Sequence, residues 1–299
     1  MAVASEQLAG SFTPLVTPFR GEAVDLEAYG RLVDHQVRGG SSGVVVTGTS
    51  GEPSVLTSSE RLDLVRAAVA AAAGRLPVVA ATGSGSHAET ADLTEAAVDA
   101  GADAVLVVTP YYLRPPQRGA ADYFVDIASR VGVPVLIYHI PGRSAFTMDI
   151  STLESIVERA PNVVGMKHAS TDLGLVTEAL LRVGPDFRIF VGLEELSLPM
   201  LAIGACGLMN AVGNLVPGRV AALCQAVLEQ RLLDARKLHQ ELWELNKAVF
   251  LDTNPIPIKY MMRRMGLLET NDHRLPMVPA TPQAEEALDG VLGRAGLLD

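Results

Sequence analysis

One lysine of this chain stands in an unusual place for its type. Lys167 ends an apolar run that begins at Val163, whereas the other three lysines occur in segments of helical pattern and are expected to be solvated: Lys237, Lys247 and Lys259. An ammonium group in the dry mouth of a folded core loses hydration, which lowers its pKa and makes the neutral amine available. Because a neutral amine attacks carbonyl carbon, the position of Lys167 indicates Schiff-base chemistry.

A structural role is the alternative for the same residue. The stem of Lys167 could lie along the core while its ammonium group reaches solvent, or the ammonium could pair with Glu52 or Glu194. Its position alone leaves these possibilities open, so the neighbouring side chains have to decide.

Hydroxyl groups follow the ends of neighbouring apolar runs. Tyr138 ends the run before that of Lys167, which places a phenol where it can move protons near the amine. Thr49 and Tyr112 follow two earlier runs and could complete a chain of hydrogen-bonded hydroxyls. Each of the three alone is more simply explained as a buried side chain with a satisfied hydroxyl. Together they predict a proton relay.

Two further features suit a substrate that carries a carboxylate. Arg143 follows a Pro-Gly turn that begins at Pro141, where its planar guanidinium can meet a carboxylate with two hydrogen bonds. An ordinary loop arginine is the alternative. Gly48 and Gly51 let their loop turn tightly and present backbone N–H groups to an anion.

Metal and nucleotide chemistry find little support. His139 and His168 form no His-x-x-x-His or His-carboxylate spacing, and the two cysteines, Cys206 and Cys224, are far apart in the sequence. The segment 83–85 is rich in glycine but lacks the lysine and the spacing of a phosphate-binding loop. We therefore expect no metal and no dissociable cofactor.

These residues require a scaffold in which the ends of several strands meet. Eight short apolar, β-branched runs alternate with helical segments: 12–17, 44–47, 78–81, 105–109, 133–138, 163–166, 188–191 and 207–209. Near-continuous apolar strands are typical of a buried parallel sheet, and eight strand-helix units close a barrel. The sequence predicts an α/β protein with a (β/α)8 TIM barrel, with an open doubly wound sheet as the alternative. In a barrel the site lies at the carboxyl ends of the strands, where the residues above occur.

The rest of the chain is expected to extend the same unit. After the eighth run the sequence continues through helical segments at 217–250, 255–266 and 282–293, without a linker rich in proline or serine. We expect residues 1–215 to form the barrel strands and first helices. Residues 216–299 would form the last barrel helix and a C-terminal helical extension.

Composition disfavours several classes of function. The 299 residues include 24 Lys and Arg against 34 Asp and Glu, a net charge of −10, which leaves no basic face for nucleic acid. No run of about 18 apolar residues could span a membrane, and the N-terminus lacks the pattern of a signal peptide. Two cysteines in apolar surroundings suit a reducing compartment. A cytoplasmic protein without nucleic-acid or membrane partners is expected.

Six motifs spread over nearly the whole chain occur together: Pro-Leu-Val-Thr-Pro-Phe at 14–19, Gly-Thr-Ser-Gly-Glu at 48–52, Val-Thr-Pro-Tyr-Tyr at 108–112, Tyr-His-Ile-Pro-Gly-Arg at 138–143, Gly-Met-Lys at 165–167 and Asn-Pro-Ile-Pro-Ile-Lys at 254–259. In these motifs the chain resembles the dihydrodipicolinate synthase/N-acetylneuraminate lyase family of pyruvate-dependent class I aldolases. The resemblance also implies a barrel fold, in agreement with the pattern of apolar runs.

The resemblance implies roles for individual residues. Lys167 would form a covalent imine with pyruvate, and Tyr138, Thr49 and Tyr112 would make the proton relay, with Tyr112 lent by an adjacent subunit. A dimer would then be the minimal active unit, and a homotetramer, a dimer of dimers, the assembly. No other cofactor is implied.

The same resemblance implies a pocket for two small-molecule substrates. Ser50, with neighbouring backbone such as that of Gly48, would hold the pyruvate carboxylate. Main chain at Gly192 and Met209 would line the pocket, and Arg143 would bind the carboxylate of the second substrate, an aldehyde.

Two reactions remain open. The best single expectation is the dihydrodipicolinate synthase reaction, in which pyruvate condenses with aspartate semialdehyde. His139 and Asn210, with Glu52-Pro53 and residues 250–254, also resemble a catabolic aldolase that cleaves 2,4-dihydroxyhept-2-enedioate to pyruvate and succinate semialdehyde. A keto-acid sensor without activity is a remote third hypothesis.

Overall fold

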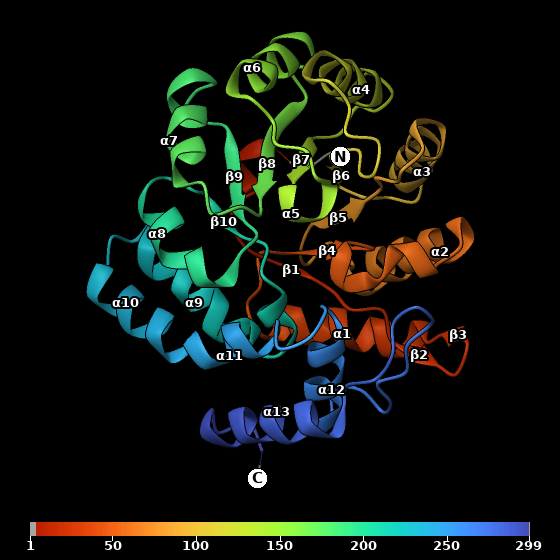
Figure 1. Cartoon of the computed structure of the whole chain (residues 1–299), viewed down its shortest axis with the longest axis vertical. Helices are drawn as coiled ribbons and strands as arrows, with labels where there is room; N and C mark the ends of the chain where they lie inside the picture. Colours follow the sequence, from red (N-terminus) through yellow and green to blue (C-terminus); the bar gives the residue numbers. More distant parts are fainter. Residues whose placement is uncertain (1–3, 299) are drawn as a thin grey trace.

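The computed structural model of the chain describes residues 4–298 and has a closed barrel at its centre (Figure 1). Eight parallel strands form the barrel: β1 Gly10–Pro14, β4 Gly43–Val46, β5 Val78–Ala81, β6 Ala104–Val108, β7 Val135–His139, β8 Val163–His168, β9 Arg188–Val191 and β10 Gly207–Leu208. Each strand pairs with its neighbours in chain order, and β10 closes the ring on β1. The predicted (β/α)8 barrel is confirmed, including the short eighth strand.

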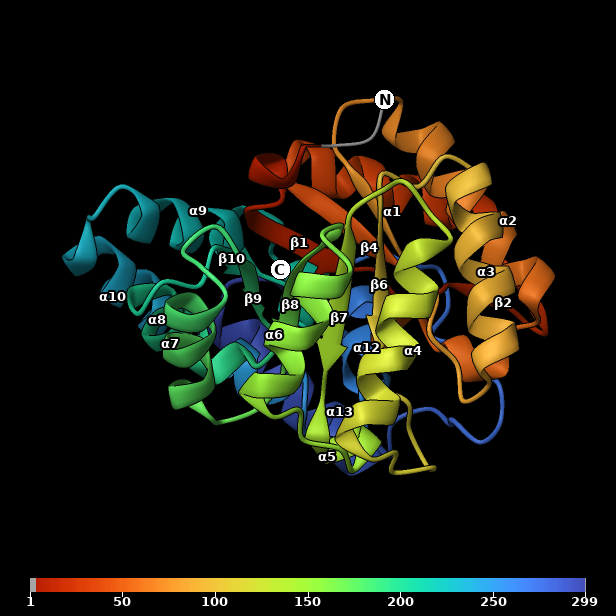
Figure 2. The same cartoon turned by 90° about the horizontal axis from the view of Figure 1, so that it is seen from above.

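Helices surround the strands, and a second group follows them in the chain. Around the barrel lie α1 Leu26–Arg38, α2 Ser58–Ala72, α3 His87–Asp99, α4 Gln117–Ser129, α6 Ile150–Arg159, α7 Leu173–Arg182, α8 Ser197–Ala202 and α9 Pro217–Leu228. The later helices are α10 Leu232–Glu241, α11 Trp243–Ala248, α12 Ile256–Arg264 and α13 Pro282–Arg294. Figures 1 and 2 show α2, α3, α4, α6 and α7 side by side outside the strands.

Short elements complete the chain between these helices and strands. A two-stranded hairpin joins β2 Phe19–Arg20 to β3 Ala23–Val24, and the single-turn helix α5 Pro141–Ser144 follows β7. Residues 4–298 contain five 3-10 turns: η1 Ser5–Gln7, η2 Thr49–Gly51, η3 Pro53–Val55, η4 Glu194–Leu196 and η5 Ala211–Asn214. Most of them lie in the loops that follow strands, so they shape the rim of the barrel.

The strands are buried on both faces, which explains their unbroken apolar sequences. In β4 the side chain of Val45 packs inside the barrel, whereas Val44 and Val46 pack outward against the helices. This alternation follows from the two-residue period of a strand. A buried parallel strand therefore needs an apolar residue at every position.

Local signals in the sequence fix where helices begin. The Thr57 hydroxyl accepts a hydrogen bond from the Glu60 N–H, and the Glu60 carboxylate accepts one from the Thr57 N–H, so the predicted capping box is present at the start of α2. At the start of α1, the Asp25 carboxylate accepts a hydrogen bond from the Ala28 N–H and caps the helix.

The register between β7 and β8 contains one irregularity. Val135 pairs with Val163, but the next residue, Leu136, pairs with Gly165, so one residue of β8 has no pairing partner in β7. From there the pairing is regular and sets Tyr138 opposite Lys167. The predicted proximity of these two strand ends is confirmed.

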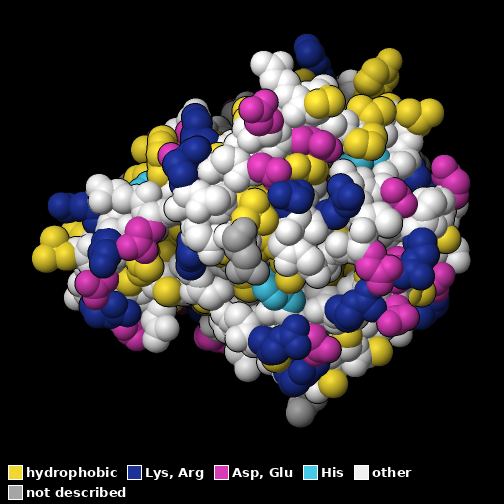
Figure 3. Space-filling view, turned by 90° about the horizontal axis from the view of Figure 1, so that it is seen from below, with side chains coloured by type: hydrophobic (Ala, Val, Ile, Leu, Met, Phe, Trp, Pro, Cys, Tyr) yellow, Lys and Arg dark blue, Asp and Glu magenta, His cyan; other side chains and the backbone are white. Residues whose placement is uncertain are grey.

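The surface carries both signs of charge. Figure 3 shows Lys and Arg side chains interspersed with Asp and Glu on the face seen from below, without a continuous basic field. Between residues 4 and 298 no helix is both long enough and apolar enough to cross a membrane.

Candidate active site

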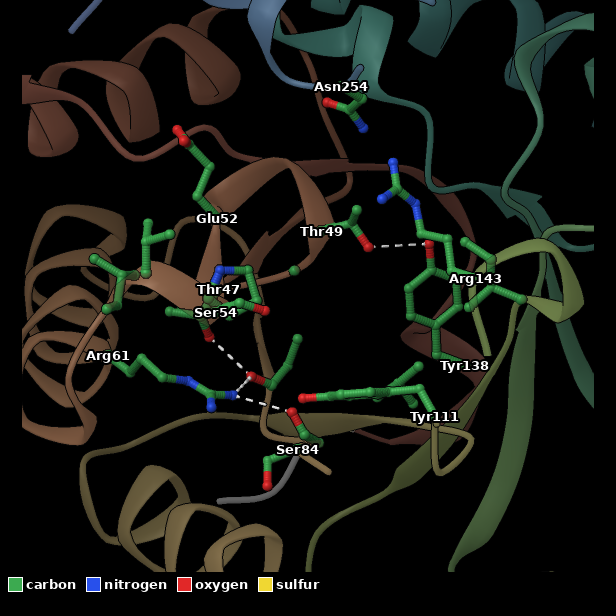
Figure 4. A pocket seen from close by; sticks show the side chains of 18 of the residues that line it. Thr47, Thr49, Glu52, Ser54, Arg61, Ser84, Tyr111, Tyr138, Arg143 and Asn254 are labelled. Atoms are coloured by element: carbon green, nitrogen blue, oxygen red, sulfur yellow. Dashed lines mark hydrogen bonds between the residues drawn. The ribbon is translucent and has the colours of Figure 1, made fainter. Parts of the chain in front are cut away.

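A cavity of about 520 Å³ opens at the carboxyl ends of the strands. Its walls come from the loops after β4, β5, β6 and β7 and from the segment before α12, and they include Thr49, Arg61, Tyr111, Tyr138, Arg143 and Asn254 (Figure 4). This is the edge of a barrel at which loops from different strands can place their side chains around one ligand.

Two of the predicted relay residues are in contact. The Tyr138 hydroxyl lies 3.3 Å from the Thr49 hydroxyl, and both line the cavity (Figure 4). Tyr138 ends β7, and Thr49 begins the 3-10 turn η2 directly after β4. A proton on either oxygen can therefore pass to the other along a hydrogen bond.

Lys167 lies beside Tyr138 and is almost fully buried, with 5% of its surface exposed. Its Nζ atom is 4.5 Å from the centre of the Tyr138 ring. Tyr138 lines the cavity, whereas Lys167 lies next to the cavity and outside its wall. The lysine and the tyrosine are thus brought together as predicted, and Tyr138 is the residue that both lines the cavity and contacts Lys167.

The two carboxylates that could have paired with Lys167, those of Glu52 and Glu194, form hydrogen bonds with other groups. Glu52 pairs with Lys259, at 2.9 Å. Glu194 accepts a hydrogen bond from the Ala211 N–H, at 2.6 Å. Burial raises the pKa of the Glu194 carboxyl to about 7, although this N–H and the charge of Lys167 act in the opposite direction.

Gly192 lies against the side chain of Lys167. A Cβ atom at this position would come within 2.8 Å of Lys167 Cε and 2.9 Å of Ala169 Cβ, so only glycine leaves room for the lysine. Its N–H donates to the carbonyl of His168, in the strand that carries Lys167. Met209, directly after β10, is buried inside the barrel, where its N–H donates to Val191.

The turn η2 is tied to the C-terminal part of the chain. The Ser50 hydroxyl accepts a hydrogen bond from the Asn254 side-chain amide, at 3.1 Å, and the Gly51 carbonyl accepts one from the Thr17 hydroxyl, at 2.7 Å. Gly48 precedes the turn in extended backbone and lines the cavity. Ser50 itself is buried. The two hydrogen bonds, from Asn254 and from Thr17, hold the turn on both sides.

Lys259 is buried, and the prediction that it is solvated was wrong. It is 0% exposed and pairs with Glu52, which also lies 3.3 Å from His273. Its Nζ also donates to the Asp272 carbonyl and lies 4.4 Å from the centre of the Phe19 ring. The helical pattern around Lys259 correctly indicated a helix but not which face of that helix would be covered.

Arg143 is exposed at the rim and lines the cavity from α5. Figure 4 shows its guanidinium group between Asn254 and the Thr49–Tyr138 pair. The position allows a carboxylate in the cavity to meet the guanidinium fork.

Tyr112 does not reach the cavity of its own chain. Its side chain is 93% exposed, and its backbone has a positive φ of 71°. The neighbouring Tyr111 lines the cavity instead. Within one subunit, therefore, Thr49 and Tyr138 are together and Tyr112 is apart from them.

Arg61 is a cavity residue that was missed from the sequence. It is buried in α2, and its guanidinium donates to the carbonyls of Ala81, at 3.0 Å, and Gly83, at 3.4 Å. Burial lowers its pKa, against the charge of Glu89. Its helical spacing to Leu64 puts a charged residue on the apolar stripe of α2, and this signal could have identified it.

Histidines and carboxylates are dispersed in the described part of the chain. From residue 4 to residue 298, no three or more His, Cys, Asp or Glu side chains are grouped so that they could hold a metal ion. His139 and His168 contact each other through their Nδ1 atoms, at 3.0 Å.

Comparison with known proteins places this geometry in a family. A model of the dihydrodipicolinate synthetase family matches residues 7–295. The 4-hydroxy-tetrahydrodipicolinate synthase of Thermus thermophilus is 44% identical over 290 residues, which are 97% of this chain and 97% of that protein.

Solved structures are similar over the whole barrel. The dihydrodipicolinate synthase from Aquifex aeolicus superposes with a TM-score of 0.95 at 37% identity, over 97% of this chain and 98% of that one. The chloride-inhibited dihydrodipicolinate synthase from Acinetobacter baumannii, complexed with pyruvate, gives a TM-score of 0.94 at 32% identity, over 97% and 100%. This chain therefore belongs to the dihydrodipicolinate synthetase family and is a lyase of the pyruvate-dependent, Schiff-base-forming kind.

Proposed function

We propose that Lys167 is the lysine that forms the imine, and that this chain condenses pyruvate with aspartate semialdehyde. The observation that carries the proposal is the pairing of Tyr138 with Lys167 on adjacent strands, with Nζ 4.5 Å from the tyrosine ring. A buried amine beside a phenol that lines the cavity has both the nucleophile and the proton carrier that imine formation needs.

The reaction begins with attack of the neutral Lys167 amine on the keto carbon of pyruvate. Loss of water leaves a protonated imine, which acidifies the methyl group, and removal of a methyl proton gives an enamine. The enamine carbon then forms a bond to the aldehyde carbon of the second substrate, whose oxygen takes up a proton. The amino group of that substrate attacks the imine carbon and closes a ring, a proton moves to the lysine nitrogen, and Lys167 leaves as the free amine. Tyr138 carries the protons, and its 3.3 Å contact with Thr49 connects it to the next hydroxyl of the relay.

The pyruvate carboxylate is assigned to the turn that follows β4. Ser50 supplies a hydroxyl beside Gly48, which borders the cavity, while Gly192 packs against Lys167 and Met209 lies inside the barrel. The hydrogen bond from Asn254 occupies Ser50 as an acceptor, which leaves the serine O–H free to donate to a carboxylate.

The third hydroxyl of the relay is assigned to Tyr112 of the partner subunit. The support is the 93% exposure of Tyr112 in the loop after β6, together with its absence from the cavity wall that Thr49 and Tyr138 line in its own chain. A homodimer is then the minimal active unit, and a homotetramer built from two such dimers is the proposed assembly.

The second substrate is assigned from Arg143 and from the relatives. Arg143 faces the cavity beside the relay, where it can pair with the carboxylate of aspartate semialdehyde. Relatives with 40% to 44% identity over almost the full chain are 4-hydroxy-tetrahydrodipicolinate synthases. The two cysteines, Cys206 and Cys224, are free, which suits the proposed cytoplasmic location.

A substrate comparison tests this assignment. Purified protein is supplied with pyruvate and either aspartate semialdehyde or succinate semialdehyde, and consumption of pyruvate is followed with the products identified by mass spectrometry. We expect rapid turnover with aspartate semialdehyde only, and an Arg143→Leu variant with a raised KM for the aldehyde. Turnover confined to succinate semialdehyde would replace the synthase with the aldolase of hydroxy-oxo diacids.

A further inference from the structure

The residues that directly follow Tyr138 and Lys167 form a second, separate contact between the same two strands. His139 and His168 pair across β7 and β8, with both rings buried and inclined at 16° to each other. Because side chains alternate along a strand, these rings point away from the barrel interior that Tyr138 occupies. No step of the proposed reaction uses them.

The hydrogen bonds of the pair assign one proton to each ring. The Met148 N–H donates to His139 Nε2, at 3.2 Å, so that nitrogen carries no proton and the proton of a neutral ring is on Nδ1. This Nδ1–H donates to His168 Nδ1, at 3.0 Å, and His168 Nε2–H donates to the Asp172 carbonyl, at 2.9 Å. This series of three hydrogen bonds begins at a backbone N–H and ends at a backbone carbonyl. A further proton on either ring would replace an accepting nitrogen with a donor and break one of these hydrogen bonds.

The pair is formed in one register only. The irregularity after Val135 permits a competing alignment without the extra residue, in which Leu136 would face Val164 and Tyr138 would face Met166. His139 would then face Lys167, and the two histidines could not meet. The register that joins the two rings is also the one that sets Tyr138 beside Lys167.

The same hydrogen bonds hold two loops of the rim. Met148 belongs to the segment between α5 and α6, and Arg143 lies five residues earlier, in α5. Asp172 directly precedes α7, and its carboxylate caps the helix by accepting a hydrogen bond from the Leu175 N–H, at 3.1 Å. The histidines therefore connect the loop after β7 to the loop after β8.

We propose that His139 and His168 are a pair of positioning residues: their neutral, hydrogen-bonded bridge holds β7 and β8 in the register that sets Tyr138 beside Lys167 and fixes the loop that carries Arg143. This inference rests on the proposed role of Lys167 for its kinetic consequence. The bridge itself is a property of the folded chain and can be measured without any substrate.

Nitrogen spectroscopy tests the bridge directly. Full-length protein labelled with 15N-histidine is studied by solid-state NMR at pH 7, and the signals of the pair are assigned by their loss in His139→Phe and His168→Phe variants. We expect one neutral ring protonated at Nδ1, lost with His139, and one neutral ring protonated at Nε2, lost with His168. The same tautomer in both rings, or a charged ring, would overturn the proposal.

Kinetics test the positioning. The rate of borohydride-trapped imine formation with pyruvate is measured for both variants and for their double variant, below the unfolding midpoint of each, with His87→Asn at an exposed site as control. Each single variant should trap pyruvate about tenfold more slowly, and the double variant no more slowly than the worse single one, because the two rings act as a unit. KM for the aldehyde should rise in the same variants.

Two other outcomes distinguish failure of the positioning role from failure of the proposed function. Folded variants that form the imine within twofold of the parent rate would reduce the pair to a stability role and overturn the inference. If the parent protein itself trapped no pyruvate, the proposed function would fail, while the nitrogen signals would still show whether the bridge exists.

Discussion

At the scale of single residues, the site depends on how closely small groups pack around one amine. Lys167 is confined between the Tyr138 ring, 4.5 Å from Nζ, and the backbone of Gly192. The packing leaves the lysine little freedom, so its amine is held in the place that the proposed imine formation needs. Confinement of this kind contributes to rate because a reacting group that is already aligned loses little entropy on reaching the transition state.

Gly192→Ala tests this confinement. The added Cβ would meet Lys167 Cε at 2.8 Å and Ala169 Cβ at 2.9 Å, and because the lysine tail is the more flexible of the two, we expect the tail to move further. Imine formation should slow by about 100-fold, since small misplacements of reacting groups have costs of that size. Stability should fall by only about 1–3 kcal/mol.

Gly293→Ala is the matched control for this change. Gly293 lies in α13 with nothing within 4 Å of the position of its added Cβ. We expect full trapping activity and unchanged or slightly higher stability. Imine formation at the parent rate in Gly192→Ala would show that Gly192 does not confine the lysine.

At the scale of elements, buried polar contacts join segments that are far apart in the chain. Glu52, directly after η2, and Lys259, in α12, are 207 residues apart and meet at 2.9 Å. Together with the Asn254–Ser50 hydrogen bond, this pair fixes the turn that carries Thr49 against the last helices. The later helices thus help to hold the part of the cavity to which we assign pyruvate.

Lys259→Met should strongly destabilise the protein. The change leaves the Glu52 carboxylate buried without its cation, which typically costs about 3–5 kcal/mol. Chemical denaturation measures the loss, and Lys237→Met, at a 79% exposed side chain, should change stability by less than about 0.5 kcal/mol. A double variant with Glu52→Gln should recover part of the loss. A Lys259→Met protein as stable as the control would show that the buried pair contributes nothing.

The histidine bridge makes stability depend on pH. Burial lowers the pKa of both rings, that of His139 to about 4, and the charge of Asp172 opposes this for both. Because the unfolded chain binds these protons near pH 6.5, the unfolding free energy should fall as the pH drops from about 6.5 towards 4. The slope is at most about 1.4 kcal/mol per pH unit for each ring.

A difference curve isolates this contribution. Glu194, whose pKa is raised to about 7, acts oppositely, because its contribution is complete below its unfolded pKa and is lost as the pH rises through 7. The double variant His139→Phe/His168→Phe retains Glu194, so subtraction of its curve removes that term. Parallel curves for parent and double variant would contradict the neutral, buried bridge.

At the scale of the whole molecule, one subunit holds only two of the three hydroxyls of the proposed relay close together. Thr49 and Tyr138 meet inside the barrel rim, whereas Tyr112 stands out from the surface on the loop after β6. An exposed tyrosine on a backbone with positive φ is explained if a second copy of the chain covers it. The proposed dimer supplies that cover and completes both sites by symmetry.

Mixed dimers test whether the partner supplies the third hydroxyl. Tyr112→Phe and Lys167→Ala subunits are expected to be nearly inactive when each is expressed alone. In a mixed dimer, the subunit that keeps Lys167 would receive an intact tyrosine from its partner. Co-expression with two different tags should therefore restore activity, and mixed dimers without activity would show that Tyr112 does not act across the interface.

The sequence predicted the barrel well because each strand is buried on both faces and so reads as an apolar run. Lys167 and Tyr138 were found for the same reason, as polar residues at the ends of such runs. Arg61 and Lys259 were missed because burial of a charged helix residue depends on distant partners, such as the Ala81 carbonyl and Glu52. Those contacts arise only when the barrel closes.

The most direct test of the central claim is the intact mass of the protein after incubation with pyruvate and borohydride. The account predicts one reduced pyruvate adduct per chain, mapped to Lys167 by peptide analysis and absent from a Lys167→Ala variant treated identically. An adduct on a different lysine, or no adduct under conditions that trap a known imine-forming aldolase, would contradict it.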